Sequence, residues 1–370
     1  MIRDNRKPLL HAVHALVVLA YATASSAEPI VINVRTYGAT GDGRSDDSPA
    51  LQRAVSALNE AGGGELYFPP GTYLHSEAIA VSGRVIVSGA GAESVLKALA
   101  PASAALVFAD ASQCGAQNLR IVSDARTRLH EQNSAGVVMD NVENCYVKHL
   151  SIEGGASAGI LIANSRAVTV SENHVADTLA DGIHVVNGSS DVVVESNFAS
   201  NTGDDSFSAV AYASWPKQTD NVIIKSNTSV SSHARGVACI GASRCRIYDN
   251  TVNNSRGHGI AVAYESSYNT YHPYGARLVG NQITTAHPKE GTNSVLVSGA
   301  KDVEIDSTSI EGGNPVLVSE SWGVIVRNLM MNKQAGVPVL ERGHVQLNIE
   351  GVSANGTALV DRRLIVKKIQ

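Results

Sequence analysis

Four short segments in the middle of the chain share one pattern: Asp181-Gly-Ile-His-Val, Asp205-Ser-Phe-Ser-Ala, Arg235-Gly-Val-Ala-Cys and His258-Gly-Ile-Ala-Val. Each begins with an ionisable residue and continues as a short, mostly apolar strand. The intervals between them are 24, 30 and 23 residues, which is typical of solenoids, where each repeat stacks on the last. Paired strands of neighbouring coils lie about 4.8 Å apart, so the four ionisable residues are expected to form one column about 14 Å long. We call them the ionisable column.

Asparagine repeats with the same period on another side of the coils. The residues are Asn173, Asn197, Asn227, Asn250, Asn281 and Asn328. The first five are spaced by 24, 30, 23 and 31 residues, and the last gap spans two coils, with Ser307 near the missing position. Buried polar groups need partners. We therefore expect these side chains to stack and to hydrogen-bond from coil to coil.

The fold predicted from these patterns is all-β, a single-domain right-handed parallel β-helix of about ten coils, because crossovers between parallel strands are almost always right-handed. One segment departs from the strand pattern: Asp47 or Ser48 can cap a helix with Pro49 in its first turn and an apolar face through Leu58. We expect this helix to cover the first coil. The predicted boundaries are a cap at 28–75, coils at 76–331 and C-terminal coils or cap at 332–370.

Residues 1–27 have the pattern of a secretory signal peptide, with basic residues, an apolar run and a small-residue cleavage site at Ala24-Ser-Ser-Ala. The sequence therefore predicts a secreted or periplasmic protein with no membrane insertion after cleavage. Removal of this segment changes the formal net charge from −5 to about −7. An acidic chain of this kind argues against binding to nucleic acid. The sequence carries no signal for an oligomeric state.

The four cysteines lack the paired spacing of a zinc site or of a disulfide framework. Cys114 and Cys145 are expected to stack in neighbouring coils, whereas Cys239 and Cys245 fall within one coil. We interpret all four as small apolar core residues. A disulfide between Cys114 and Cys145 is the alternative if the compartment is oxidising.

Two coils are longer than the others, and the extra residues, 211–220 and 263–277, follow strands of the ionisable column. The coil between them makes the same connection with Gly241-Ala-Ser-Arg. We expect two walls on either side of a low coil, with a cleft beside the column. Aromatic rings with polar edges suit the faces of sugars. The candidate substrate-binding residues are His184, Tyr212, Trp215, His233, Tyr264, Glu265, Tyr268 and Tyr271, and Tyr274 lies in the same insertion.

Asp204 and Asp205 are adjacent, and Asp181 lies one coil away. Crowded carboxylates repel each other, which raises at least one pKa and leaves an acid beside a base near neutral pH. Glycoside hydrolysis uses such a pair, in which one carboxyl protonates the leaving oxygen and another activates water or attacks carbon. The candidate catalytic residues are Asp181, Asp204, Asp205, Arg235 and His258, and hydrolysis requires no metal or other cofactor.

The N-terminal stretch Thr36-Tyr-Gly-Ala-Thr-Gly-Asp-Gly-Arg-Ser-Asp-Asp-Ser-Pro, followed by Gly62-Gly-Gly-Glu-Leu-Tyr-Phe-Pro-Pro-Gly-Thr-Tyr, resembles that of the pectate lyase-like β-helix superfamily. Ala180-Asp-Gly and Gly203-Asp-Asp resemble the Asn-Thr-Asp-Gly and Gly-Asp-Asp motifs of glycoside hydrolase family 28, the polygalacturonases. The resemblance implies Asp204 or Asp205 as general acid and Asp181 with the other as base, in an inverting reaction.

The chain departs from the polygalacturonase pattern in the next coils. The family has Gly-His-Gly where this chain has Ala234-Arg-Gly, and Gly257-His-Gly follows one coil later. The family's Arg-Ile-Lys substrate clamp has no evident equivalent, although Arg235 could hold an anionic sugar. These departures keep the lyase alternative open: β-elimination of a uronate needs a cation, either Arg or calcium, and a base. Epimerisation uses similar groups and ranks below it.

The sequence therefore predicts an enzyme that cleaves a uronate-containing polysaccharide, by hydrolysis ahead of elimination. Under the lyase alternative, Asp181, Asp204 and Asp205 would hold calcium. The non-enzymatic alternative is a carbohydrate-binding solenoid. The concentration of unlike charges in one column argues against it, because the two preceding coils have Ala158 and Ala135 at this position.

Overall fold

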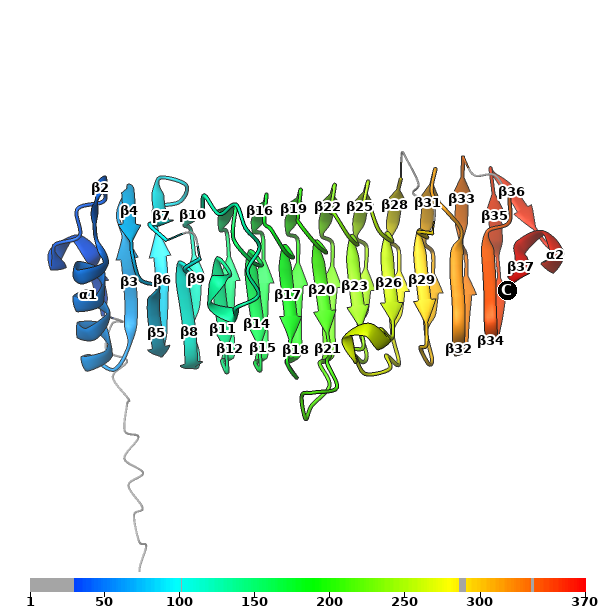
Figure 1. The fold of residues 1–370 in the computed structure, drawn as a ribbon, viewed down its shortest axis with the longest axis horizontal. Coiled ribbons are helices and arrows are strands. Elements are labelled where there is room, and N and C mark those ends of the chain that lie inside the picture. The colour runs from blue at the N-terminus through cyan, green and yellow to red at the C-terminus, as the bar shows by residue number, and fades with distance from the viewer. Residues whose placement is uncertain (1–29, 101, 286–290, 334–335) are drawn as a thin grey trace, which may run out of the picture.

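The computed structural model describes residues 30–370 apart from 101, 286–290 and 334–335. The chain forms a single right-handed parallel β-helix, and its coils follow one another along the long axis (Figure 1). The strands make one sheet of 23 strands, which covers two faces of the coils, and a second sheet of 14 strands. The predicted fold class is thus confirmed. The predicted signal peptide lies outside the described residues.

Three faces repeat in each central coil. The first face contains β11 (Val137–Asp140), β14 (Ile160–Ala163), β17 (Ile183–Val186), β20 (Phe207–Val210), β23 (Val237–Ile240), β26 (Ile260–Ala263) and β29 (Val295–Ser298). The second contains β12 (Glu143–Lys148), β15 (Arg166–Ser171), β18 (Ser190–Glu195), β21 (Asp220–Lys225), β24 (Arg246–Tyr248), β27 (Arg277–Val279) and β30 (Glu304–Asp306). The third contains β10 (Arg120–Val122), β13 (Ser151–Glu153), β16 (His174–Ala176), β19 (Phe198–Ser200), β22 (Thr228–Val230), β25 (Thr251–Asn253), β28 (Gln282–Thr284) and β31 (Ser309–Glu311).

The interior consists of columns of apolar side chains. Ile183, Phe207, Val237 and Ile260 pair in register along the first face, and each is at most 1% exposed. Because strand residues alternate between the two faces of a sheet, every second residue points inward. The 14-stranded sheet contributes about one strand per coil, so there are more coils than the ten expected.

The asparagine ladder is present. The amide nitrogen of Asn227 donates to Oδ1 of Asn250 at 3.0 Å, and its own Oδ1 accepts from Asn197 at 3.0 Å. The backbone N–H of each residue also donates to the next side chain, so the buried amides are satisfied from coil to coil. This pattern extends from Asn173 to Asn281.

The ladder does not include Asn328, which corrects the sequence-based prediction. The strand register places Thr308 and then Leu329 in the column after Asn281. Asn328 lies one residue out of register, in a turn with φ of 48°, and its amide donates to Asp306 at 2.9 Å. Spacing alone could not show this shift, because turn positions also favour asparagine.

The N-terminal helix α1 (Ser48–Glu60) buries Leu51, Ala54 and Leu58. As predicted, it covers the N-terminal end of the solenoid (Figure 1). Asp47 occupies the N-cap position, but its side chain does not cap the helix. Instead its carboxylate accepts the backbone N–H of Thr40 at 2.6 Å and that of Gly41. It therefore holds the preceding loop rather than the helix terminus.

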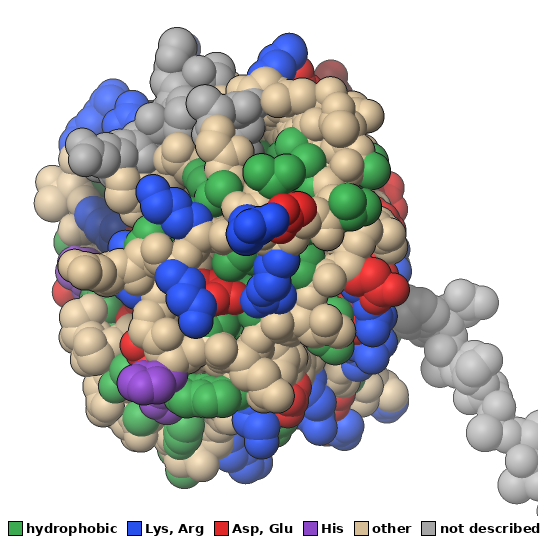
Figure 2. Space-filling model, turned by 90° about the vertical axis from the view of Figure 1, so that its right-hand side faces the viewer, with side chains coloured by type: hydrophobic (Ala, Val, Ile, Leu, Met, Phe, Trp, Pro, Cys, Tyr) green, Lys and Arg blue, Asp and Glu red, His purple; other side chains and the backbone are tan. Residues whose placement is uncertain are grey.

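The opposite end continues for one more coil, β34 (Val339–Glu350) and β35 (Val352–Ala354), before the repeat stops. An antiparallel strand β36 (Thr357–Leu359), a short helix α2 (Arg362–Ile365) and the final strand β37 (Val366–Ile369) close it. Lys and Arg side chains gather on this end face, with Asp and Glu among them (Figure 2). Such charges protect the edge of a sheet from pairing with other chains.

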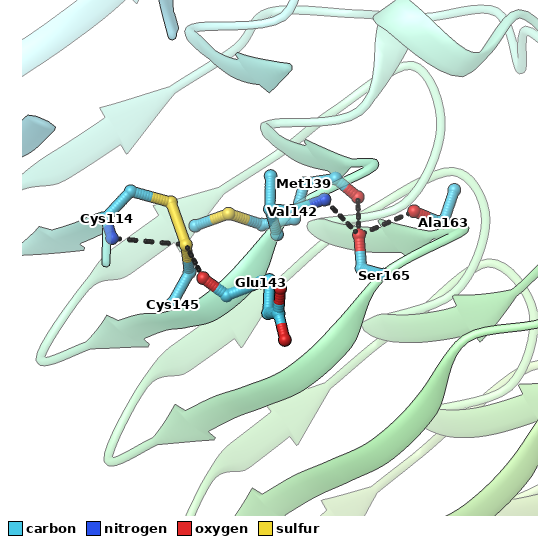
Figure 3. The surroundings of a disulfide bond; sticks show 7 residues. All are labelled: Cys114, Met139, Val142, Glu143, Cys145, Ala163 and Ser165. Atoms are coloured by element: carbon cyan, nitrogen blue, oxygen red, sulfur yellow. Dashed lines mark hydrogen bonds between the residues drawn. A yellow bond between two sulfur atoms is a disulfide. The ribbon is translucent and has the colours of Figure 1, made fainter. Parts of the chain in front are cut away.

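All four cysteines form disulfides, which corrects their interpretation as unpaired core residues. Cys114, before β9 (Gly115–Gln117), bonds Cys145 of β12 in the next coil (Figure 3). Cys239 bonds Cys245 across one turn. The second pair was missed because the spacing of Cys239 and Cys245 does not show that the turn between them directs both side chains into the interior. No helix in the described ranges has the length and apolar character of a membrane span.

Candidate active site

The strand register aligns the ionisable column as predicted. Asp181, Asp205, Arg235 and His258 each lie two residues before paired positions of the first face. Side chains in the column accept backbone N–H groups of the following coil: Asp181 Oδ1 accepts from Asp205 at 3.0 Å, and Asp205 Oδ1 accepts from Arg235 at 2.8 Å. The two aspartates of the column therefore have a structural contact in addition to their charge.

Three carboxylates converge at this point. Oxygen atoms of Asp181, Asp204 and Asp205 all lie within 4.8 Å of one another. The side chains of Asp181 and Asp205 are 13% and 5% exposed, whereas that of Asp204 is 33% exposed. The pKa of Asp205 is raised to about 7: burial is the largest cause, the charges of Asp181 and Asp204 act in the same direction, and Arg235 opposes the shift. The cluster therefore retains a proton near neutral pH.

Three cationic side chains surround the carboxylates. Arg235 pairs with Asp205 at 3.2 Å and with Glu265. His184 Nδ1 lies 2.8 Å from Asp181 Oδ2. Burial disfavours the charged imidazole, but the charges of Asp181, Asp205 and Asp204 outweigh burial and raise the pKa of His184.

The third cation is Arg128, whose guanidinium lies 2.7 Å from Asp204 Oδ2. The cleft lining also includes the carboxylates of Glu265 and Glu131. Acidic and basic side chains are thus interspersed around the cluster.

The carboxylates open into a cleft of about 520 Å³ over β14, β17, β20 and β23. Its floor includes Leu161 and His184. The corresponding outward residues of the coils before and after, Val138 and Ala261, are fully buried. The ion pair between Arg235 and Glu265 joins the start of β23 to the loop after β26. The cleft is therefore short, extending over about four coils rather than along the whole face.

The two insertions meet each other instead of forming separate walls, which corrects the prediction. Tyr212 pairs with Thr270 in an antiparallel bridge, and the backbone N–H of Tyr271 donates to Ala211 at 2.9 Å. Gln218 donates to the carbonyl of Gly241 between them. The two insertions thus meet over the short connection at Gly241. Together they form one wall, at the C-terminal ends of the strands that form the cleft floor.

The opposite wall comes from residues that the sequence reasoning missed. Arg128, His130 and Glu131 line the cleft, and the backbone N–H of Leu129 donates to Ala156 at 2.8 Å. The connection from β10 to β11 covers 123–136, whereas the same connection before β14 covers 154–159. The greater length of the 123–136 connection is the feature of the sequence that could have identified this wall.

The structure divides the sequence-predicted site residues into two groups. Those in the cleft are Asp181, Asp204, Asp205, Arg235, His184, Tyr212, Glu265 and Tyr268. The lining does not include His258, Trp215, His233, Tyr264 or Tyr271. Three of the five excluded residues, Trp215, Tyr264 and Tyr271, belong to the two bridged insertions.

The residues outside the lining have structural contacts. Tyr264 stacks on His272 with ring centroids 4.0 Å apart, and the hydroxyl of Tyr271 donates to the carbonyl of Trp215. His258 Nδ1 accepts the backbone N–H of Asn293 at 2.9 Å. Burial and the positive charge of Arg235 lower the pKa of His258 to about 4.

Carboxylate oxygens are the ligands that calcium prefers, and a calcium ion takes six to eight of them. Asp181, Asp204 and Asp205 offer such oxygens within 4.8 Å of one another. Two of these carboxylates already pair with Arg128 and Arg235. A calcium ion at this position would have to displace one or both guanidinium groups.

Proteins of known sequence and structure share this fold. A family model described as rhamnogalacturonase A/epimerase, pectate lyase-like, matches residues 31–261. Mannuronan C5-epimerase AlgE5 of Azotobacter vinelandii is 25% identical over 284 residues, which are 74% of this chain and 26% of that protein. The chain thus spans about a quarter of the length of this relative.

Two solved structures illustrate the likeness in fold. The Streptococcus pneumoniae surface adhesin PfbA is 16% identical with a TM-score of 0.74, covering 89% of this chain and 98% of that chain. An exopolygalacturonase from Thermotoga maritima is 16% identical with a TM-score of 0.68, covering 90% and 94%. Because the family model matches more than half of the sequence, the protein belongs to the rhamnogalacturonase A/epimerase family of pectate lyase-like proteins.

Proposed function

We propose that the protein hydrolyses glycosidic bonds of a uronate-containing polysaccharide outside the cytoplasm. The observation that carries this proposal is the cluster of three carboxylates in the cleft, in which the pKa of Asp205 is raised to about 7. Such a cluster supplies a proton donor and an ionised carboxylate at the same pH. Two disulfides support an oxidising compartment.

The roles follow from protonation and accessibility. One of Asp204 and Asp205 protonates the leaving oxygen, and Asp181 with the other carboxylate activates water. The cations Arg128, His184 and Arg235 hold the ionised carboxylates in place. Arg235, at the cleft floor, is also suited to a sugar carboxylate, since guanidinium binds carboxylates through a planar pair of donors.

A panel of acidic and neutral polysaccharides tests the reaction class. The protein without residues 1–27 is incubated with each one, while reducing ends and the ultraviolet absorbance of unsaturated uronates are followed together. Hydrolysis produces reducing ends without absorbance, and elimination produces both. Asp205→Asn is expected to abolish turnover while circular dichroism shows the wild-type fold, and unchanged turnover in this variant contradicts the carboxylate assignment.

A second substrate separates the acid from the base. On an aryl glycoside of the released sugar, departure of the leaving group needs little protonation. The variant that lacks the general acid should therefore regain most of its activity there, whereas the variant that lacks the base should not. Comparing Asp204→Asn with Asp205→Asn on both substrates assigns the acid, and failure of both variants on the aryl substrate excludes an acid role for either.

The stereochemistry is a separate measurement. The carboxylate oxygens lie within 4.8 Å of one another, closer than the roughly 6.5–9.5 Å between carboxyl groups in typical inverting enzymes. The polygalacturonase resemblance nevertheless implies inversion. The anomeric configuration of the first product, read by proton NMR before mutarotation, decides between inversion and a covalent glycosyl intermediate.

The second candidate is reaction at C5 of a uronate, by elimination or epimerisation. It is favoured by Arg235, which can neutralise the sugar carboxylate, and by the names of relatives such as the C5-epimerase AlgE5. Calcium bound by the three aspartates would supply further positive charge. Epimerisation shows itself as incorporation of deuterium from heavy water at C5 without new reducing ends, and a requirement for calcium is tested with a chelator.

A third candidate is binding without catalysis, since PfbA, which shares the fold, is described as an adhesin. It predicts association with a polysaccharide and no change in that polysaccharide by any of these measurements. The convergence of carboxylates and guanidinium groups in one cleft favours catalysis over this candidate.

A further inference from the structure

The exposed large aromatic side chains of the described part of the chain lie in one region. They are Trp215, Tyr268, Tyr274 and Trp322. Trp215 follows β20, and Tyr268 and Tyr274 follow β26. Trp322 lies in the corresponding bend within β32 (Val316–Arg327), whose first half pairs with β29 and whose second half pairs with β30. Each ring thus belongs to the connection between the first and second faces.

Two of these rings flank a lysine in three successive coils. Tyr274 pairs with Lys301, and Lys301 pairs with Trp322, in parallel bridges. We call these three residues the aromatic strip. The backbone N–H of Gly275 donates to Lys301 at 2.9 Å, which fixes the register of the first two coils.

The side chains of the strip point outward. The residues that precede them, Pro273, Ala300 and Ser321, are buried, and alternation in extended chain sends the next side chain to solvent. Tyr274 is 44% exposed and Trp322 is 51% exposed. Rings of this size are usually covered, so two of them exposed in register indicate a surface that binds something.

The strip is separate from the cleft. None of its three residues lines the cleft, and the coils of Lys301 and Trp322 lie beyond β26, toward the C-terminal end. It follows the wall formed by the two insertions, which carries Trp215 and Tyr268. The exposed rings therefore continue from the cleft wall along the long axis of the solenoid.

We propose that the aromatic strip binds a polysaccharide chain bearing carboxylates, outside the cleft and parallel to the solenoid axis. Tyr274 and Trp322 are two coils apart, so their backbones are separated by about 10 Å, which is close to the length of a disaccharide. Sugar rings two units apart would stack on the two aromatic faces. Lys301, between them, is placed to pair with the carboxylate of a uronate unit.

The charges around the strip fit a carboxylate at Lys301. Arg244, whose backbone N–H donates to the carbonyl of Tyr274 at 2.8 Å, adds a guanidinium one coil before the strip and pairs with Asp220. Asp302 follows Lys301, and its Oδ1 lies against the backbone of Gly323 in the next coil. The ammonium of Lys301 is therefore the charge that lies between the two rings.

Affinity electrophoresis tests the proposal without turnover. Asp205→Asn serves as the parent, and native gels contain polygalacturonate, alginate or the neutral glucan laminarin. We expect the parent to be retarded by one or both polyuronates. Adding Tyr274→Ala and Trp322→Ala should weaken the apparent affinity by on the order of fivefold for each ring. Lys301→Gln should weaken polyuronate binding and reduce its sensitivity to salt.

Met330→Ala is the matched control, because Met330 is also exposed and apolar but lies on the third face. It should be retarded like the parent. Retention of full affinity in the Tyr274 and Trp322 double variant, or absence of retardation of the parent by both polyuronates, overturns the proposal. With Asp205 restored, the double variant should keep its turnover of short oligosaccharides and lose it on the polymer. Because retardation needs no catalysis, failure of the hydrolase proposal leaves this test intact.

Discussion

At the scale of single residues, the site depends on how a few charges are buried together. Asp205 accepts two hydrogen bonds from Arg235, which favour its ionised form, yet burial outweighs them and raises its pKa. Asp181 and Asp204 add negative charge beside it. Asp205 is therefore hydrogen-bonded by Arg235 and still retains its proton near neutral pH. Acid–base catalysis at neutral pH needs a group with such a pKa.

The raised pKa of Asp205 predicts a pH dependence of stability. The folded state holds its proton up to about pH 7, whereas an unfolded aspartate releases it near pH 4. The free energy of unfolding should therefore fall as the pH rises from about 4 to about 7. Asp205→Asn removes this titrating group. The free energy of unfolding of the variant, relative to that of wild type, should therefore rise by on the order of 1–4 kcal/mol from pH 4 to pH 8.

Urea unfolding of both proteins at several pH values measures this difference. His258, whose lowered pKa has the opposite effect between about pH 4 and 6.5, is present in both and cancels. A constant difference between wild type and variant across this range contradicts the raised pKa of Asp205.

At the scale of elements, the coils are joined by ladders that cross from one strand to the next. The asparagine ladder satisfies buried amides with buried amides, and the ionisable column satisfies backbone N–H groups with carboxylates. Both depend on the register of the paired strands, which places equivalent residues of successive coils next to each other. An apolar residue in either column leaves donors of the neighbouring coil without a partner.

Asn227→Ala tests the ladder. Asn227 is 1% exposed and links Asn197 to Asn250, so its removal leaves buried amides unsatisfied in two coils. We expect a loss of about 2–4 kcal/mol in the free energy of unfolding, measured by urea denaturation. Asn348→Ala is the control: Asn348 is exposed on β34 and has no left-handed backbone, so the loss should stay below about 0.5 kcal/mol. Equal losses in the two variants would mean that the ladder contributes little.

At the scale of the whole molecule, the length of the cleft is set by loops from distant parts of the chain. The 123–136 connection reaches three coils forward to place Arg128 on Asp204. On the other side, the two insertions bridge over the low coil. Together they leave an opening of about 520 Å³, which suits a few sugar units and not a long segment of polymer.

A short cleft predicts action near the ends of polymer chains. The viscosity of a degraded polysaccharide should fall slowly while reducing ends accumulate, and chromatography should show short oligosaccharides from the first time points. This expectation holds for hydrolysis and elimination alike. A steep early fall in viscosity would mean that the enzyme cuts within chains and that the two walls move apart to admit them.

The sequence was sufficient for the architecture and for the alignment of the ionisable column. The reason is physical: a solenoid converts spacing along the chain into position in space, so Asp181 and Asp205 can be placed side by side by counting residues. The capping helix followed from its own periodicity and its proline. The shift at Asn328 shows the limit of this method, since one residue in a turn changes the column.

Contacts between segments that are not adjacent in the repeat needed the tertiary structure. Arg128 meets Asp204 across three coils, Tyr212 meets Thr270 over a bridged coil, and Cys239 reaches Cys245 inside one turn. The periodic pattern contains no information about where a long loop folds. The repeat in the sequence therefore determined which residues form the columns. Only the tertiary structure decided which of them face the cleft, because strand pairing does not fix the positions of the loops.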